Sequence, residues 1–415
     1  NGEINTLKGN INWMKIHEQD MKSKFFDDIE SLKPIITPGN SDSAALDNVF
    51  ELLVRSGKSI PLVKLMLIPD AWSKRRKTVL KAHQHLFNFL NSTIEPWDGP
   101  AAIAATDGKW VIVATDRNGL RPLRYTLSTD KLLYAGSETG MIPIPNDKVI
   151  SKGRLGPGQI VAVNLDQGKV FNSKSIKDYI SKDYKKYSKQ IIDLDKKFDI
   201  KKEKFFYKSE ELRRRQFLAG VSIEDLELIL HPMVEDIKEA VGSMGDDTAL
   251  AMLSTLPRSI YDYFRQQFAQ VTNPPIDSLR ESSVMSLEAC FGPELNIFEE
   301  TKEHAKRIVS TSPVLSHKKL SSLLNNSYFD SESFDLIYSP KNNLQDALLT
   351  LTKKVVASVK RGTVIIHLNE LLPSANGLSI NALLAVGCIH QELVKLGLRS
   401  DANLIISTAT ARDTH

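Results

Sequence analysis

The first two residues, Asn1 and Gly2, supply two hydrogen-bond donors that can converge on one oxygen atom. Asn1 offers a carboxamide N–H, and the backbone N–H of Gly2 is unobstructed because glycine has no Cβ. Donors placed in this way stabilise the negative charge that develops on a carbonyl oxygen during acyl transfer. Asn-Gly is also a common turn signal, so the dipeptide alone leaves a plain turn as the alternative.

Asp42 lies in a Ser-Asp-Ser sequence at residues 41–43, directly before a run of apolar residues at helical spacing. These apolar residues follow the i, i+3, i+4, i+7 pattern of one helix face, and polar capping types precede them. The members of the pattern are Leu46, Val49, Phe50 and Leu53. The sequence therefore predicts a capped amphipathic helix that begins near Ser41 and carries Asp42 in its first turn.

Metal and phosphate chemistry have little support in the sequence. His83 and His85 are two residues apart on a predicted helix, so they point to different faces, and no carboxylate completes a ligand set. The most glycine-rich stretch, residues 153–158, contains Pro157, which removes an N–H that a phosphate nest needs. We expect a tight turn at that stretch and no metal site.

Composition excludes several other classes of protein. The 415 residues carry 54 Lys and Arg against 50 Asp and Glu, an excess too small to indicate nucleic acid as the main partner. The two cysteines, Cys290 and Cys388, form no C-x-x-C motif, which excludes a cysteine-ligated iron–sulfur cluster within this chain. No apolar run reaches the ~20 residues that span a membrane. We expect a cytoplasmic protein with no membrane partner, or a plastid protein in a photosynthetic eukaryote.

Two kinds of fold follow each other along the chain. Short β-type runs at 101–105, 110–115, 132–135 and 160–163 follow predicted helices at 41–54 and 73–90, which indicates an α+β region. Residues 334–338, 363–368 and 402–407 read as strands that alternate with helices at 344–359 and 379–396, which predicts an α/β region with a parallel βαβαβ sheet. The lysine-rich residues 174–215 read as a solvated connector, with a nucleic-acid arm as the less favoured alternative.

The ends of the chain suggest a piece of a longer polypeptide. The sequence begins without Met and stops directly after an apolar run that reads as a buried strand.

Seven motifs, in this order, resemble the large subunit of glutamate synthases. They are Asn-Gly-Glu-Ile-Asn-Thr-Leu-Lys-Gly-Asn (1–10), Ser-Asp-Ser (41–43), Glu-Pro-Trp-Asp-Gly-Pro-Ala-Ala (95–102), Asp-Arg-Asn-Gly-Leu-Arg-Pro-Leu-Arg-Tyr (116–125), Gly-Ser-Glu-Thr-Gly (136–140), Gly-Ser-Met-Gly-Asp-Asp (242–247) and Phe-Arg-Gln-Gln-Phe-Ala-Gln-Val-Thr-Asn-Pro-Pro-Ile-Asp (264–277). The resemblance implies that residues 1–190 are the later half of a type 2 glutaminase domain, part of an N-terminal-nucleophile αββα sandwich. Residues 191–415 would then be most of the central domain, cut short at its C-terminal end.

The family's pattern assigns roles to three residues of this sequence. Asn1 and Gly2 match the oxyanion hole, and Asp42 matches the carboxylate that binds the α-amino group of glutamine. The nucleophilic Cys of the family, its carboxylate-binding arginine and the His before Asn-Gly would all lie upstream of Asn1. The side chain of Asn1 cannot replace that Cys, because a carboxamide is not a nucleophile.

By the same resemblance, the intact enzyme hydrolyses glutamine, carries the ammonia through the protein, and aminates and reduces 2-oxoglutarate to glutamate, while the fragment alone is inactive. FMN and an iron–sulfur cluster are expected in a C-terminal domain beyond this chain, which itself binds no cofactor. An NADPH-oxidising small subunit or ferredoxin is the expected electron-donating partner. Two alternatives stay open: a phosphoribosyl-type amidotransferase, for which no phosphoribosyl pyrophosphate loop is found, and a non-catalytic scaffold derived from a glutaminase.

Overall fold

The computed structural model of the protein describes residues 2–71, 78–195, 207–239, 249, 251–255, 258–264, 287–371 and 377–412. The described residues pack as two units. The first unit consists of residues 2–195 and 287–320, and the second consists of those between 207 and 264 together with those from 321 to 412. The first unit therefore takes in residues on both sides of position 190, and the assignment of domains to 1–190 and 191–415 stays a prediction.

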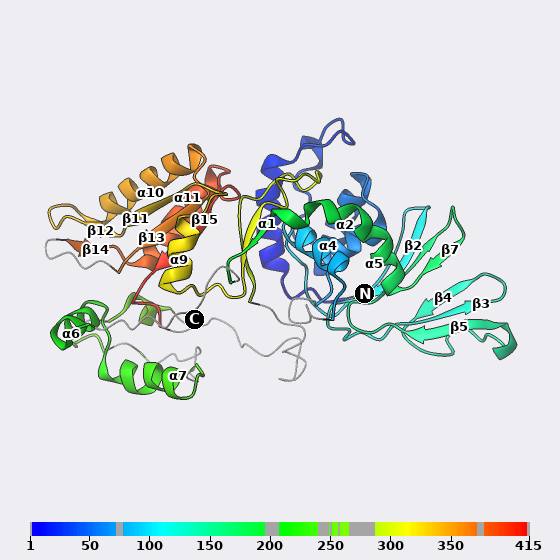
Figure 1. Cartoon of the computed structure of the whole chain (residues 1–415), viewed down its shortest axis with the longest axis horizontal. Coiled ribbons are helices and arrows are strands. Elements are labelled where there is room, and N and C mark those ends of the chain that lie inside the picture. Colours follow the sequence, from blue (N-terminus) through cyan, green and yellow to red (C-terminus); the bar gives the residue numbers. More distant parts are fainter. Residues whose placement is uncertain are drawn as a thin grey trace. The chain divides into compact units, whose positions relative to one another are not determined.

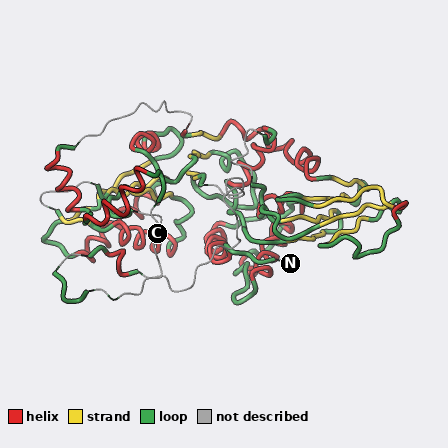
Figure 2. Tube along the Cα trace, turned by 90° about the horizontal axis from the view of Figure 1, so that it is seen from below, coloured by secondary structure: helices red, strands yellow, loops and turns green. Residues whose placement is uncertain are grey.

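Two antiparallel sheets lie between residues 102 and 171 of the first unit (Figure 1). One sheet has the order β1 (Ala102–Thr106), β2 (Trp110–Thr115), β6 (Ile160–Asn164) and β7 (Lys169–Phe171). The other has the order β4 (Leu133–Gly136), β3 (Arg124–Ser128) and β5 (Val149–Arg154). Figure 2 shows these strands extending together away from the helices of the unit. A small apolar cluster joins the two sheets through Val113 and Val161 from the first and through Tyr125 and Leu133 from the second.

The described part of the first unit contains the helices α1 (Leu7–Asp20), α2 (Asp42–Arg55), α3 (Ile60–Leu67), α4 (Lys81–Asn91) and α5 (Ser173–Ser181), of which α3 contacts β2 and α5 contacts β6 and β7. The helix predicted from Ser41 is confirmed, with the Ser41 hydroxyl accepting from the Ala44 N–H. The helix predicted at 73–90 is wrong at its start. Residues 72–77 lie outside the described part, and α4 begins only at Lys81 because Leu80 is extended (φ −57°, ψ 138°).

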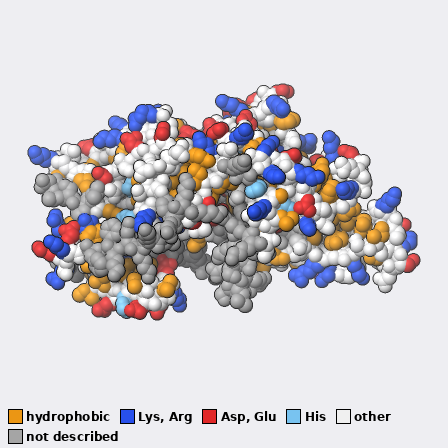
Figure 3. All heavy atoms as spheres, viewed as in Figure 1, with side chains coloured by type: hydrophobic (Ala, Val, Ile, Leu, Met, Phe, Trp, Pro, Cys, Tyr) orange, Lys and Arg blue, Asp and Glu red, His pale blue; other side chains and the backbone are white. Residues whose placement is uncertain are grey.

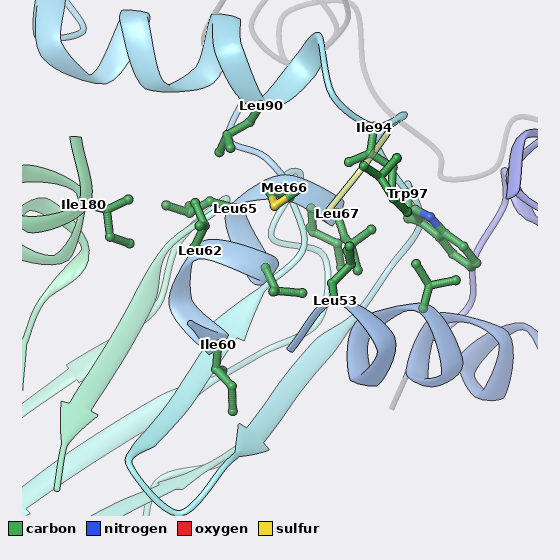
Figure 4. Close-up of a cluster of buried hydrophobic side chains, with 14 of the residues drawn as sticks. Leu53, Ile60, Leu62, Leu65, Met66, Leu67, Leu90, Ile94, Trp97 and Ile180 are labelled. Atoms are coloured by element: carbon green, nitrogen blue, oxygen red, sulfur yellow. The ribbon is translucent and has the colours of Figure 1, made fainter. Parts of the chain in front are cut away.

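The main core of this unit lies among α2, α3, α4 and α5 (Figure 4). Helix α3 is buried along its whole length, so its apolar residues need no polar face. Leu53, Leu67 and Trp97 pack in this core with little or no solvent exposure. The Trp97 N–H donates to the Leu67 carbonyl at 2.6 Å, which fixes the chain that leaves α4 and leads to β1.

A third sheet extends the first unit beyond residue 190. Strand β8 (Ile191–Asp193) pairs in parallel with β10 (Arg307–Ser310), which pairs antiparallel with β9 (Ala289–Phe291). Tyr184 and Tyr187 are buried nearby and donate to the side chain and backbone of Glu300. The interpretation of residues 174–215 as a solvated connector is therefore wrong for its first twenty residues, because Ile176, Ile180, Tyr184 and Tyr187 pack into the core.

The second unit contains a parallel sheet of three strands, in the order β11 (Ser331–Asp335), β13 (Ile365–Asn369) and β15 (Asn403–Ser407). Helices α10 (Leu344–Lys360) and α11 (Ala382–Lys395) connect these strands in sequence, and both contribute to one buried cluster. The run predicted as one strand at 334–338 is split. Its second part is β12 (Ile337–Tyr338), which pairs with β14 (Leu378–Ser379) in a separate two-stranded sheet.

Shorter helices complete the second unit: α6 (Ser209–Leu218), a π-helical turn (Asp225–Leu230) and α7 (His231–Glu235). Ser222 and Asp225 exchange hydrogen bonds before this turn, as their spacing predicts for a capping box. Several apolar side chains here are exposed, among them Phe217 and Val234, and orange side chains lie over these helices in Figure 3. Helix α9 (His317–Leu324) lies at the division between the two units.

Candidate functional site

Residues 2–5 lie as an extended segment against residues 98–101, directly before β1. The Glu3 N–H donates to the Pro100 carbonyl at 2.9 Å, and the Asn5 N–H donates to the Asp98 carbonyl at 2.8 Å. Gly2 stands opposite Ala101 in an isolated antiparallel bridge. This pairing adds the start of the sequence to the edge of the first sheet, next to β1.

The hydrogen-bond pattern sets the direction of the Gly2 N–H. Because Glu3 rather than Gly2 donates to the 98–101 segment, Gly2 and Ala101 form a non-hydrogen-bonded pair. In such a pair the N–H and C=O of the residue point away from the partner strand. The N–H of Gly2 is therefore directed to the side away from residues 98–101.

Two glycines allow this close approach. A Cβ on Gly2 would lie 3.0 Å from the Pro100 oxygen and from the Ala101 Cβ. A Cβ on Gly99 would lie 1.9 Å from the Glu3 oxygen, and the φ of Gly99 is +152°, which side-chain-bearing residues rarely adopt.

Asp42 reaches the same segment from the first turn of α2. Its Oδ2 accepts from the Ile4 N–H at 2.6 Å, and its Oδ1 accepts from the Ser43 N–H at 2.7 Å. The helix N-terminus favours the negative charge, and each carboxylate oxygen keeps a lone pair for a further donor. Since Ile4 is two residues after Gly2, extended-chain geometry limits their Cα separation to roughly 7 Å.

The structure thus brings Gly2 and Asp42 to one short segment although 40 positions separate them in sequence. Asn1 lies outside the described residues, so its placement stays a prediction. Two motifs noted in the sequence also lie outside the described part, Gly242–Asp247 entirely and Phe264–Asp277 from residue 265 onward.

Three charged residues near this segment have roles that sequence reasoning did not assign. The Asp98 N–H donates to the Thr6 hydroxyl, and the Asp98 carboxylate lies 3.3 Å from Nε of Arg117. Asp116 follows β2 and is buried. Asp98, Asp116 and Arg117 all lie within sequence motifs, but the motifs did not show which side chains are hydrogen-bonded to the backbone.

Lys64 is a further residue whose role the sequence reasoning did not predict. It is fully buried in α3, and its Nζ donates to the Gly158 carbonyl at 3.1 Å. Burial lowers the pKa of Lys64 to about 8, although the charge of Asp70, and more weakly that of Asp116, raises it. A single cation within the eight-residue apolar segment 60–67 was the available signal.

Two histidines elsewhere in the first unit pair with acidic residues. His17 Nε2 lies 2.8 Å from Glu95, and His83 Nε2 lies 2.8 Å from Asp178. Within the described ranges, no group of three His, Cys, Asp or Glu side chains could hold a metal ion. In the same part of the chain, no helix is both long and apolar enough to cross a lipid bilayer.

Two family models match consecutive parts of this sequence. The model described as glutamine amidotransferases class-II matches residues 1–189, and the model described as glutamate synthase central domain matches residues 214–415. Together they account for nearly the whole chain.

Curated relatives match the chain from end to end. It is 44% identical to a glutamate synthase [NADPH] large chain of Azospirillum brasilense, 39% identical to a glutamate synthase [NADH] of Saccharomyces cerevisiae and 36% identical to a chloroplastic ferredoxin-dependent glutamate synthase of Spinacia oleracea. Each alignment covers 100% of this chain but only 28%, 20% and 26% of the respective relative. The chain therefore spans between a fifth and somewhat more than a quarter of the length of these relatives.

Proposed function

We propose, on the premise that this chain belongs to the glutamate synthase family along its whole length, that Asn1, Gly2 and Asp42 hold glutamine in the glutaminase site of a longer protein. The observation that carries the proposal is the hydrogen bond from the Ile4 N–H to Asp42, because it places that carboxylate beside the segment that bears Gly2.

The proposal gives each group a part in the reaction. The amide oxygen of glutamine accepts from the Gly2 N–H and from the Asn1 carboxamide, which stabilise the oxyanion that forms when a nucleophile attacks. The ammonium group of glutamine binds the Asp42 carboxylate, whose two oxygens already accept backbone N–H groups and are thereby held in place. The nucleophile is a Cys thiolate supplied by a part of the protein outside these 415 residues, as in the class that the sequence resembles.

We also propose that the two sheets of the first unit are the inner layers of an αββα sandwich. Support comes from the apolar contact between the sheets through Val113 and Tyr125. Helices α2 to α5 contribute to a larger core with β2 and β6.

The oxidation–reduction half of the reaction takes place elsewhere in the proposal. An iron–sulfur cluster needs several thiolates, and the two cysteines of this chain do not fit that requirement, so no step is assigned to a cluster or to FMN here. Relatives named for NADPH, NADH and ferredoxin all match this chain. We therefore propose that the donor, whether a small subunit that oxidises NADPH or ferredoxin, and 2-oxoglutarate bind outside these residues. A cytoplasmic or plastid location stays a prediction.

Two observations favour this proposal over a phosphoribosyl-type amidotransferase and over a non-catalytic scaffold. A phosphoribosyl-type amidotransferase gives no reason for a match to a glutamate synthase central domain. A scaffold without activity gives no reason for the hydrogen bond that joins Asp42 to the 2–5 segment.

The test is glutamine hydrolysis by the complete gene product that contains these residues. Asp42→Asn removes the negative charge and should raise KM for glutamine by about 10- to 100-fold, the loss of one charge-assisted hydrogen bond, with a smaller change in kcat. Asp47→Asn, on the exposed face of the same helix, is the control and should leave KM within about twofold. Equal KM values in the two variants would contradict the proposed role of Asp42.

A further inference from the structure

Asp116 is a buried carboxylate whose two oxygens both bind backbone N–H groups. Oδ1 accepts from the Ala101 N–H at 3.1 Å, and Oδ2 accepts from the Asn118 N–H at 2.9 Å. The side chain is 1% exposed. A carboxylate is the side chain that can accept from both donors at once, since an amide has only one accepting atom.

The backbone of Asp116 holds two further segments. Its N–H donates to the Ala101 carbonyl at 2.9 Å, and its carbonyl accepts from the N–H groups of Gly119 and Gly158 at 3.1 and 2.8 Å. The Nζ of Lys64 donates to the Gly158 carbonyl. Asp116 therefore joins the end of β2, the start of β1, the loop before β3 and the turn before β6 at one buried point.

Residues 98–101 lie between Asp116 and the segment that carries Gly2. On one side, Ala101 forms two hydrogen bonds with Asp116, one with its carboxylate and one with its backbone N–H. On the other side, Ala101 stands opposite Gly2, and Pro100 accepts from Glu3. The direction of the Gly2 N–H therefore depends on where Asp116 holds Ala101, although Asp116 lies one strand away from Gly2.

Neighbouring groups compensate the negative charge of the buried Asp116 carboxylate. A buried carboxylate is costly unless donors and a cation compensate it. Two N–H groups do so directly, and the charge of Asp116, after the stronger effect of Asp70, raises the pKa of the fully buried Lys64 against the effect of burial. Because each carboxylate oxygen accepts from a different backbone N–H, the side chain fixes Ala101 and Asn118 relative to each other.

We propose that Asp116 is a positioning residue for the oxyanion hole, which fixes the Gly2 N–H through residues 98–101. This inference rests on the proposed glutaminase function. It goes beyond that function because Asp116 touches neither glutamine nor the reacting atoms.

The experiment compares Asp116→Asn and Asp116→Ser with Asp107→Asn in the complete gene product. Asp107 is a matched control, because its Oδ1 also accepts two backbone N–H groups, from Lys109 and Trp110, at the far end of the same β1–β2 hairpin. The oxyanion donors act mainly in the transition state. We therefore expect kcat for glutamine hydrolysis to fall about 100-fold in the Asp116 variants with KM within about threefold, while Asp107→Asn keeps both constants within about twofold.

A second readout follows hydrogen exchange of the Glu3 and Asn5 amides. Faster exchange in Asp116→Asn and native exchange in Asp107→Asn are expected, because only Asp116 holds the strand that accepts from these amides. Unchanged kcat in both Asp116 variants would overturn the inference, as would failure of both to fold, since Asp116 would then serve folding alone.

If the unsubstituted gene product releases no ammonia from glutamine, the proposed function itself fails, and this inference falls with it. A loss of kcat restricted to the Asp116 variants supports both.

Discussion

At the scale of single residues, the candidate site depends on how closely two backbone segments approach. The pairing of residues 2–5 with 98–101 leaves no room for a side chain at Gly99. This makes Gly99 a test of the site that does not touch any proposed ligand.

Gly99→Ala should displace residues 2–5, because the new Cβ would collide with the Glu3 carbonyl. We expect a loss of about 1–3 kcal/mol in the free energy of unfolding and a fall in kcat of the complete gene product. Gly108→Ala is the matched control, since Gly108 also has a positive φ (+83°) but no atom within 4 Å of its added Cβ. Urea denaturation gives both stabilities. An equally large activity loss in Gly108→Ala would mean that backbone strain at a positive φ causes the loss, and not the collision between residues 2–5 and residues 98–101.

The pair formed by the buried His17 and the half-buried Glu95 should make stability depend on pH. Burial opposes the charge on the ring, but the hydrogen bond and the charge of Glu95, with the charges of Glu294 and Asp20, together raise the pKa of His17 above 6.5. A raised folded-state pKa contributes stability that is fully present below about pH 6.5 and is lost as the pH rises through the folded-state pKa.

Glu95→Gln isolates this effect from the other histidines. The difference in the free energy of unfolding between the unsubstituted chain and Glu95→Gln should be largest near pH 6 and should shrink by pH 8.5. Thermal or urea unfolding at several pH values measures it. A difference that grows with pH would show that the pair is not held together by a protonated His17.

At the scale of elements, helix α5 depends on its first turn. Asn172 Oδ1 accepts from the N–H groups of Lys174 and Ser175, and the helix packs Ile176 and Ile180 into the core. Asn172→Ala should lower the free energy of unfolding by about 1 kcal/mol. Asn91→Ala, at an exposed position in the last turn of α4, should change it by less than about 0.5 kcal/mol. Chemical denaturation of the two variants decides the point.

Sequence patterns predicted the helices and strands whose apolar spacing is clear within the element itself. Helices α2 and α10 have apolar residues at helical spacing, and β2, β13 and β15 are short apolar runs with clear ends. Helix α3 was missed because a run that is apolar on every side has no periodicity. Strands β3 and β5 were missed because arginine, lysine and glycine interrupt their alternation.

The candidate site was only partly accessible to sequence reasoning. Residue types gave the chemistry of Asn1 and Gly2, and the resemblance gave Asp42. No local pattern indicates that residues 2–5 pair with 98–101, because such a pairing depends on contacts between residues more than 90 positions apart. Asp116 was quoted as part of a motif, but its role follows only from the two N–H groups that it binds.

At the scale of the whole molecule, the two units have separate buried cores. Leu53 belongs to the core of the first unit, and Ile389 belongs to that of the second. We expect scanning calorimetry of the chain to show two transitions. Leu53→Ala should lower only one of them and Ile389→Ala only the other, each by about 2–5 kcal/mol in unfolding free energy. A single transition that both substitutions shift equally would contradict the independence of the cores.

The sheet of β8, β10 and β9 has a consequence for the protein while it is being made. Strand β8 ends at Asp193, but its neighbour β10 ends only at Ser310, roughly 115 residues later. At about 5–20 residues per second, a ribosome needs on the order of 6–23 seconds to synthesise that stretch. During this interval β8 lacks its partner β10, while residues of the second unit are already leaving the ribosome. Nascent chains stalled before Ala289 should therefore be more easily cleaved near residue 190 than chains stalled well beyond Ser310.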